Sequence, residues 1–116
     1  MDKKFKKIRD NNPEKQCFEF AFSVTSTDEV LEMFKNFNQY YFEIREYIKL
    51  KKGDLVAFAP TPNGNVCHAG IIERLNKNIK NVIIRSTFFG LEGLYEHKLN
   101  DTPAQFGRYF RIYRRK

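Results

Sequence analysis

The chain has 116 residues, 41% of them hydrophobic and 16% aromatic, which suits one domain with a packed core and excludes an intrinsically disordered tail. No apolar run approaches the length of a membrane span, and the charged first residues lack the apolar segment of a secretory signal. The formal net charge of +7 allows weak, salt-sensitive contact with a polyanion. We therefore expect a single cytoplasmic domain over residues 1–116.

The first predicted element after the basic segment 1–10, which we expect to be frayed or to form a short turn, is an apolar helix. Asn12 is a suitable N-cap and Pro13 a suitable first helical residue. The pattern that follows predicts a helix over 13–23. Cys17 lies in its first turns, near the positive end of the helix, which stabilises a thiolate.

A second helix and a change of period follow. Ser26 and Glu29 have the spacing of a capping box and predict a helix that ends near Asn38. From Tyr41 to Ile48 apolar and polar residues alternate, which predicts a strand.

The remainder reads as short strands separated by turns rich in Asn, Gly and Pro. A short turn at 76–78 makes its two neighbouring strands an antiparallel hairpin. Residues 88–94 form an irregular apolar loop. The predicted fold class is α+β, with N-terminal helices packed on an antiparallel β-sheet. The predicted strands after residue 50 are 54–59, 66–74, 81–87, 95–99 and 109–114.

A cysteine and a histidine carry the predicted chemistry. Cys17 on a helix and His68 at the start of a strand would form a nucleophile–base pair if the fold brings them together. Taken singly, each also fits a structural role, as a small core residue and as a hydrogen-bonded histidine. Cys67 and His97 would complete four zinc ligands, but no paired ligand spacing is present, and we predict no metal and no cofactor.

Four stretches carry a resemblance to a known family: Gln16–Ala21, Lys52–Phe58, His68–Glu73 and Val82–Thr87. With them the chain resembles the papain-like fold in its small bacterial form, the NlpC/P60 and CHAP cysteine peptidases and amidases. The Gly-Asp-Leu-Val and His-Ala-Gly-Ile-Ile pieces are the more specific ones.

The resemblance implies roles for particular residues. Cys17 would be the nucleophile, and His68 would be its general base and then the acid for the leaving group. A third polar residue on the next strand would orient the histidine, and a symmetric count back from the 76–78 turn places Ser86 or Thr87 opposite His68. This hydroxyl departs from the family, which more often has His, Asn or an acid there. His97 is a substitute. The oxyanion hole would use the Cys17 N–H and a side chain from Asn11, Asn12 or Gln16.

Three functions follow, in order. The first is thiol-dependent hydrolysis of a peptide, an isopeptide or a cell-wall amide bond, with a peptide or protein as substrate. The second is a catalytically inactive papain-like binding module, such as a phage or bacterial effector that engages a host partner. The third is a basic nucleic-acid-binding domain that uses Arg108, Arg111 and Arg114.

Overall fold

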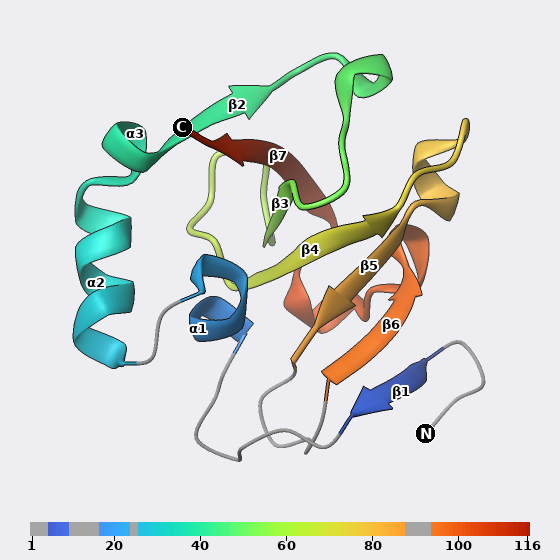
Figure 1. The fold of residues 1–116 in the computed structure, drawn as a ribbon, viewed down its shortest axis with the longest axis horizontal. Helices are drawn as coiled ribbons and strands as arrows, with labels where there is room; N and C mark the ends of the chain where they lie inside the picture. The colour runs from blue at the N-terminus through green and yellow to red at the C-terminus, as the bar shows by residue number, and fades with distance from the viewer. Residues whose placement is uncertain (1–4, 10–16, 24–25, 88–93) are drawn as a thin grey trace.

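The computed structural model of the protein describes residues 5–9, 17–23, 26–87 and 94–116. Within these residues, seven strands form one antiparallel sheet in the order β1-β6-β5-β4-β3-β7-β2 (Figure 1). An α+β domain with an antiparallel sheet, as predicted, is therefore confirmed. The strands are β1 Lys6–Arg9, β2 Tyr41–Ile44, β3 Leu55–Ala59, β4 His68–Arg74, β5 Ile83–Ser86, β6 Leu94–Lys98 and β7 Tyr109–Arg115. The α-helices are α1 Cys17–Phe22, α2 Thr27–Lys35 and α3 Phe37–Tyr40, and the 3-10 turns are η1 Tyr47–Lys49, η2 Ile79–Asn81, η3 Leu99–Asp101 and η4 Ala104–Phe106.

The helices lie close to where the sequence predicts them, but the second predicted helix is divided: α2 ends at Lys35, and α3 runs from Phe37 to Tyr40. The Ser26 side chain caps α2 by accepting a hydrogen bond from the Glu29 N–H at 3.2 Å, as the capping-box spacing indicates. Of the first predicted helix, the structure describes only the part that forms α1; residues 13–16 lie outside the described residues. No helix in the described part of the chain is both long enough and apolar enough to cross a bilayer.

Two strand predictions need correction. The strand predicted over 41–48 ends at Ile44, because the chain leaves the sheet edge through η1 and buries Leu50 in the core. Ile48, expected on the inner face, is consequently exposed. The segment 1–10, expected to be frayed or to form a short turn, instead contains β1, which pairs with β6.

The sheet has an apolar core on each face, because residues of a strand alternate between the two faces. On one face, Ala21 and Phe22 of α1 pack with Leu55 of β3 and Ala69 of β4. On the other face the strands pack against residues from the 3-10 turns and the segments beside them. This second core contains Ile44, Leu50, Val56, Phe58, Ile72, Val82, Ile84, Leu99 and Ile112.

Candidate functional site

His68 is the first residue of β4, and its ring is enclosed by aromatic side chains. It pairs with Phe58 across the β3–β4 ladder, with their ring centroids 5.7 Å apart, and the Phe106 ring lies 4.8 Å away. Only 1% of the residue is exposed. Burial, together with the charge of His97, lowers the pKa of His68 to about 4, so the ring is neutral at pH 7.

His97 and Ser86 form a buried hydrogen-bonded pair on the neighbouring strands. His97 Nδ1 lies 2.8 Å from the Lys98 carbonyl oxygen, which can only accept, so Nδ1 carries the proton. In the neutral ring Nε2 then accepts a hydrogen bond from the Ser86 hydroxyl at 3.3 Å. Burial lowers the pKa of His97, against the opposing effects of the Lys98 hydrogen bond and the Asp101 charge. The His97 ring is therefore buried beside β5. It lies close enough to His68 for a charge on His97 to lower the pKa of His68.

The predicted position of Ser86 and Thr87 opposite His68 is wrong. The β4–β5 ladder pairs Ile71 with Arg85, and a Cβ built on Gly70 would lie 2.8 Å from Ser86 Oγ, so Ser86 faces Gly70 rather than His68. The symmetric count fails because the connection is longer than the 76–78 turn and includes η2, which shifts the pairing of β5 along β4; the bulge before Arg74 offsets only part of this shift.

Thr87 is buried directly after β5. Its hydroxyl has no hydrogen-bond partner among the residues that the structure describes. Burial of a hydroxyl without a hydrogen-bond partner costs free energy. Thr87 is therefore a polar residue at this end of the sheet that does not stabilise the fold through a hydrogen bond to the described residues.

Cys17 begins α1, and α1 packs against β4 and β5 near the start of β4 (Figure 1). The side chain of Cys17 lies outside the described residues, as do the oxyanion candidates Asn11, Asn12 and Gln16. The contacts of α1 are with the Ala69 face of the sheet, whereas the His68 ring lies with Phe58 on the other face. The thiol and the imidazole could therefore form a hydrogen bond only if the two side chains met beyond the end of β4, where the faces of the sheet join.

The Gly-Asp-Leu-Val piece has a structural role. Gly53 has a φ of 94°, which favours glycine, and its N–H donates to the Ile72 carbonyl at 2.8 Å. Asp54 is buried and accepts two hydrogen bonds of 2.8 Å from the Arg114 guanidinium and one from the Lys51 N–H. These hydrogen bonds join Asp54, the residue before β3, to β7 and hold the start of the Gly-Asp-Leu-Val piece in place.

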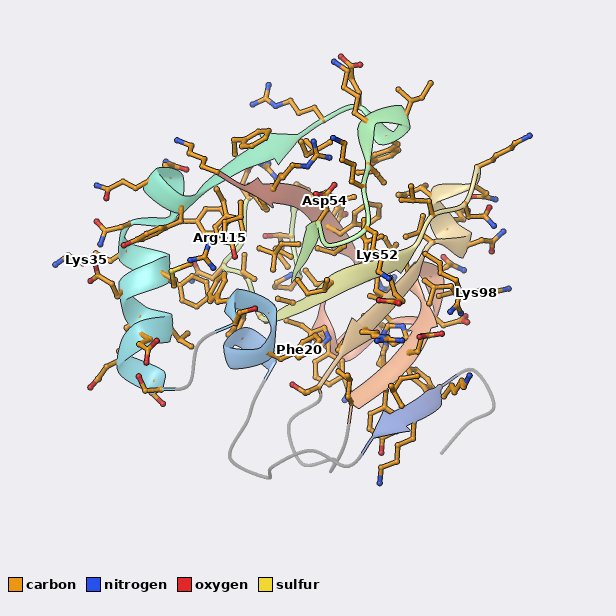
Figure 2. The ribbon with its side chains drawn as sticks, viewed as in Figure 1. Phe20, Lys35, Lys52, Asp54, Lys98 and Arg115 are labelled. Atoms are coloured by element: carbon orange, nitrogen blue, oxygen red, sulfur yellow. The ribbon has the colours of Figure 1, made fainter. Side chains whose placement is uncertain are left out.

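Several basic residues near the end of the chain contact other parts of the protein. Arg115 reaches from β7 to the helical side and donates to the Phe22 carbonyl at 3.2 Å (Figure 2). Arg111 lies 3.6 Å from a Glu43 carboxylate oxygen, and Lys116 donates to the Asn38 carbonyl at 2.7 Å. These contacts hold the side chains in place, and the bonds to carbonyl oxygens leave the charges of Arg115 and Lys116 unchanged.

One contribution to the site was missed by sequence reasoning, and the place of a second, His97, was not predicted. Phe106, which covers His68, comes from a loop between Pro103 and Gly107 that carries no periodic signal. The position of His97 has a signal, because alternation along β6 places it on the face of its partner Ile84.

Comparison of the chain with known protein families, curated proteins and solved structures gave no match.

Proposed function

We propose that the chain is a thiol-dependent hydrolase of amide bonds in which Cys17 is the nucleophile and His68 carries the protons. The observation that carries this proposal is the packing of α1, which begins at Cys17, against β4, which begins at His68; because the His68 ring lies on the other face of the sheet, the proposal requires the two side chains to meet beyond the end of β4. Buried polar groups cost free energy that an apolar core does not, and the group of His68, Ser86 and His97 is typical of a functional site.

The reaction is an acyl transfer in two steps. The Cys17 sulfur attacks the carbonyl carbon of the amide while His68 accepts the thiol proton. His68 then gives that proton to the leaving amine, and a thioester remains on Cys17. Water attacks the thioester with His68 as base, which releases the carboxylate and restores the thiol.

The test is the rate of Cys17 alkylation by iodoacetamide as a function of pH. A Cys67→Ser background leaves Cys17 as the single thiol, since the sequence contains two cysteines. We expect the rate to rise with an inflection well below the free-thiol pKa of about 8.5, and His68→Gln to move the inflection back to that value. An inflection at the free-thiol value in both proteins would remove the hydrolase proposal.

One observation favours the second candidate, a binding module of the same fold without catalysis. The His68 ring is enclosed by Phe58 and Phe106, and its pKa of about 4 disfavours the imidazolium of a thiolate–imidazolium pair. This candidate predicts that Cys17 reacts at the same rate with His68 or Gln at position 68. The alkylation experiment therefore separates the two functions.

A further inference from the structure

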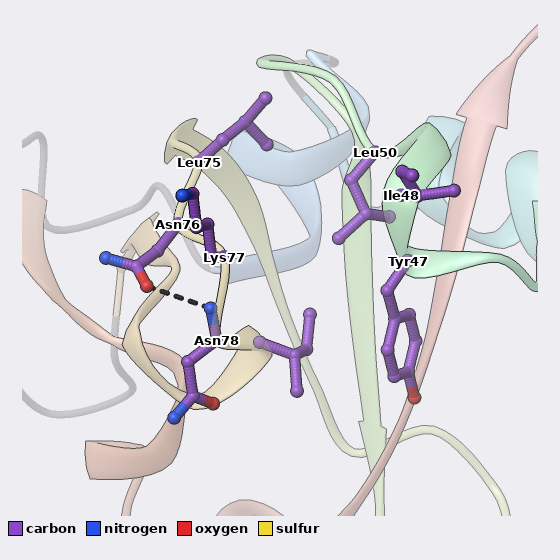
Figure 3. Close-up of a pocket in the computed structure, with 8 residues that line it drawn as sticks. Tyr47, Ile48, Leu50, Leu75, Asn76, Lys77 and Asn78 are labelled. Atoms are coloured by element: carbon purple, nitrogen blue, oxygen red, sulfur yellow. Dashed lines mark hydrogen bonds between the residues drawn. The ribbon is translucent and has the colours of Figure 1, made fainter.

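A groove of ≈940 Å³ opens between η1 and the connection that follows β4 (Figure 3). In the close-up, Tyr47, Ile48 and Leu50 face the segment from Leu75 to Asn78 across it. Its volume is in the range of ligand pockets, which is about 300–1,000 Å³. The groove is lined by Tyr47, Ile48, Leu50, Leu75, Asn76, Lys77, Asn78 and Ile79.

The walls of this groove expose large apolar side chains. Ile48 is 92% exposed, and Leu75 and Tyr47 are each about half exposed. Beneath them, Leu50 belongs to the core and Ile79 packs against it, so the apolar surface is continuous with the interior. Contiguous apolar surface of this kind marks an interaction site more often than scattered single residues do.

Both walls are held in place by hydrogen bonds of the protein itself. On one side, Asn76 Oδ1 accepts from the Asn78 N–H at 2.9 Å (dashed line in Figure 3), and Asn78 Oδ1 accepts from the Lys80 N–H at 3.0 Å. On the other side, Arg114 donates to the Lys49 carbonyl at 2.7 Å. A groove that is already formed loses little conformational entropy when a ligand binds.

Lysines lie in the groove and beside it in the sequence. Lys77 lines the groove, and Lys51 and Lys80 directly follow the lining residues Leu50 and Ile79; all three are exposed and form no ion pair with any residue in the described ranges. Lys49 is paired with Glu46 at 3.4 Å. The charge of the groove thus has the same sign as the net charge of +7 on the chain. Carboxylates would complement these lysines.

We infer that the groove binds an acidic peptide segment of a partner protein, with a bulky apolar side chain inserted between Ile48 and Leu75 and carboxylates near Lys77 and Lys80. A second copy that binds through the same groove is a poor occupant, because it would bring the same lysines to the contact. An anionic membrane is disfavoured by the recessed floor at Leu50. The groove lies about 20 Å from His68, at the other end of β4, so the inference does not depend on the proposed function.

Selection from a random peptide library displayed on phage tests the inference, because it samples many sequences against the groove at once. We expect the selected peptides to share a bulky apolar residue flanked by Asp or Glu. In fluorescence anisotropy, the double variant Ile48→Ser with Leu75→Ser should weaken a selected peptide by about tenfold or more. The charge reversal Lys77→Glu with Lys80→Glu should weaken it by a similar factor and reduce its salt dependence.

Matched controls lie on α2, where Leu31 is 60% exposed and Lys35 is also exposed. The variant Leu31→Ser with Lys35→Glu should leave peptide affinity unchanged. The inference is overturned if no peptide is enriched, if the selected peptides lack acidic residues, or if binding survives the groove variants. Sedimentation with phosphatidylserine vesicles that is lost with Ile48→Ser, in the absence of peptide binding, would overturn it in favour of a membrane.

Discussion

The two ends of β4 depart from ordinary protein structure in opposite directions. At the first end, His68 is a polar residue enclosed by Phe58 and Phe106. Beyond the last end, Leu75 is an apolar residue left in water, facing the exposed Ile48 across a groove. A buried polar group costs free energy on folding, whereas an exposed apolar side chain adds little to stability and leaves apolar surface open to a partner. The comparison indicates that one strand supports a closed polar site and an open apolar site, which separate variants can test.

The largest effect is expected from opening the closed end with Gly107→Ala. Gly107 has a φ of 110°, and a Cβ there would lie 2.6 Å from the backbone of Ala59. Strain and overlap together should lower the free energy of unfolding by about 4 kcal/mol, as measured by urea denaturation. Displacement of the adjacent Phe106 should also raise the pKa of His68 in an NMR titration.

The matched control for this variant is Gly53→Ala. Gly53 also has a positive φ, of 94°, but no atom lies within 4 Å of a Cβ built there. It should therefore lose only the conformational term, about 1 kcal/mol. Equal losses in the two variants would show that close packing at Gly107 does not hold the cover over His68.

The next effect is a pH dependence that belongs to the closed end. The pKa of His68 is lowered from 6.5 to about 4, so between these values the unfolded chain binds a proton that the folded chain does not. The contribution of His68 to the free energy of unfolding is therefore fully present above pH 6.5. It is lost as the pH falls from 6.5 to about 4, which lowers the free energy of unfolding by about 3 kcal/mol. His97 contributes with the same sign, because burial lowers its pKa too. Urea denaturation at a series of pH values measures the slope.

The variant His68→Gln isolates the part that belongs to His68. Its stability should change less between pH 6.5 and 4 than that of the parent chain, with the remaining slope due to His97 and the carboxylates. If the two slopes coincide, His68 is not held neutral by burial, and the contrast between the two ends of β4 loses its first half.

A smaller effect is expected from removing a support of the groove with Asp54→Ala. The Asp54 carboxylate is buried, and it holds both Arg114 and the Lys51 N–H. Its loss should lower the free energy of unfolding by about 2 kcal/mol, because the partners lose a charged acceptor. Glu46→Ala, which removes an exposed ion pair with Lys49, should cost less than about 0.5 kcal/mol. If Asp54→Ala lowers the free energy of unfolding as little as Glu46→Ala does, the hydrogen bonds of Asp54 do not have the structural role described here.

The smallest effect is expected from changing the exposed apolar residues at the open end of β4. Ile48→Ser with Leu75→Ser should change the free energy of unfolding by less than about 0.5 kcal/mol, because both side chains are exposed. Thermal unfolding of this variant, beside Leu31→Ser on α2, measures the difference. A loss greater than about 1 kcal/mol would mean that the two residues stabilise the fold rather than offer a surface to a partner.

Much of the fold could be predicted from local signals. Ser26 and Glu29 predicted the start of α2, and the turn residues between short segments predicted the strands from Leu55 onward. The strand over 41–48 was predicted too long, because the alternation up to Ile48 does not show that Leu50 turns into the core. β1 has no clear pattern and exists because β6 offers it an edge.

The site was predicted less well, because its geometry depends on register and on distant segments. The count that placed Ser86 opposite His68 had no means of detecting η2 or the bulge in β4. The cover provided by Phe106 comes from a loop with no periodicity. The pairing of Cys17 with His68 stays a prediction that the alkylation experiment addresses.

The strand order has a consequence for synthesis. β7 lies between β3 and β2, so Ile44 of β2 pairs with Ile112, which is made much later. Contacts between segments so distant in sequence form slowly, and the chain exposes two open strand edges until β7 leaves the ribosome. The sheet should therefore be completed only once β7 has left the ribosome. Ribosome-bound chains that stop before Tyr109 should be cleaved rapidly by protease, and resistance in them would show that the earlier strands fold alone.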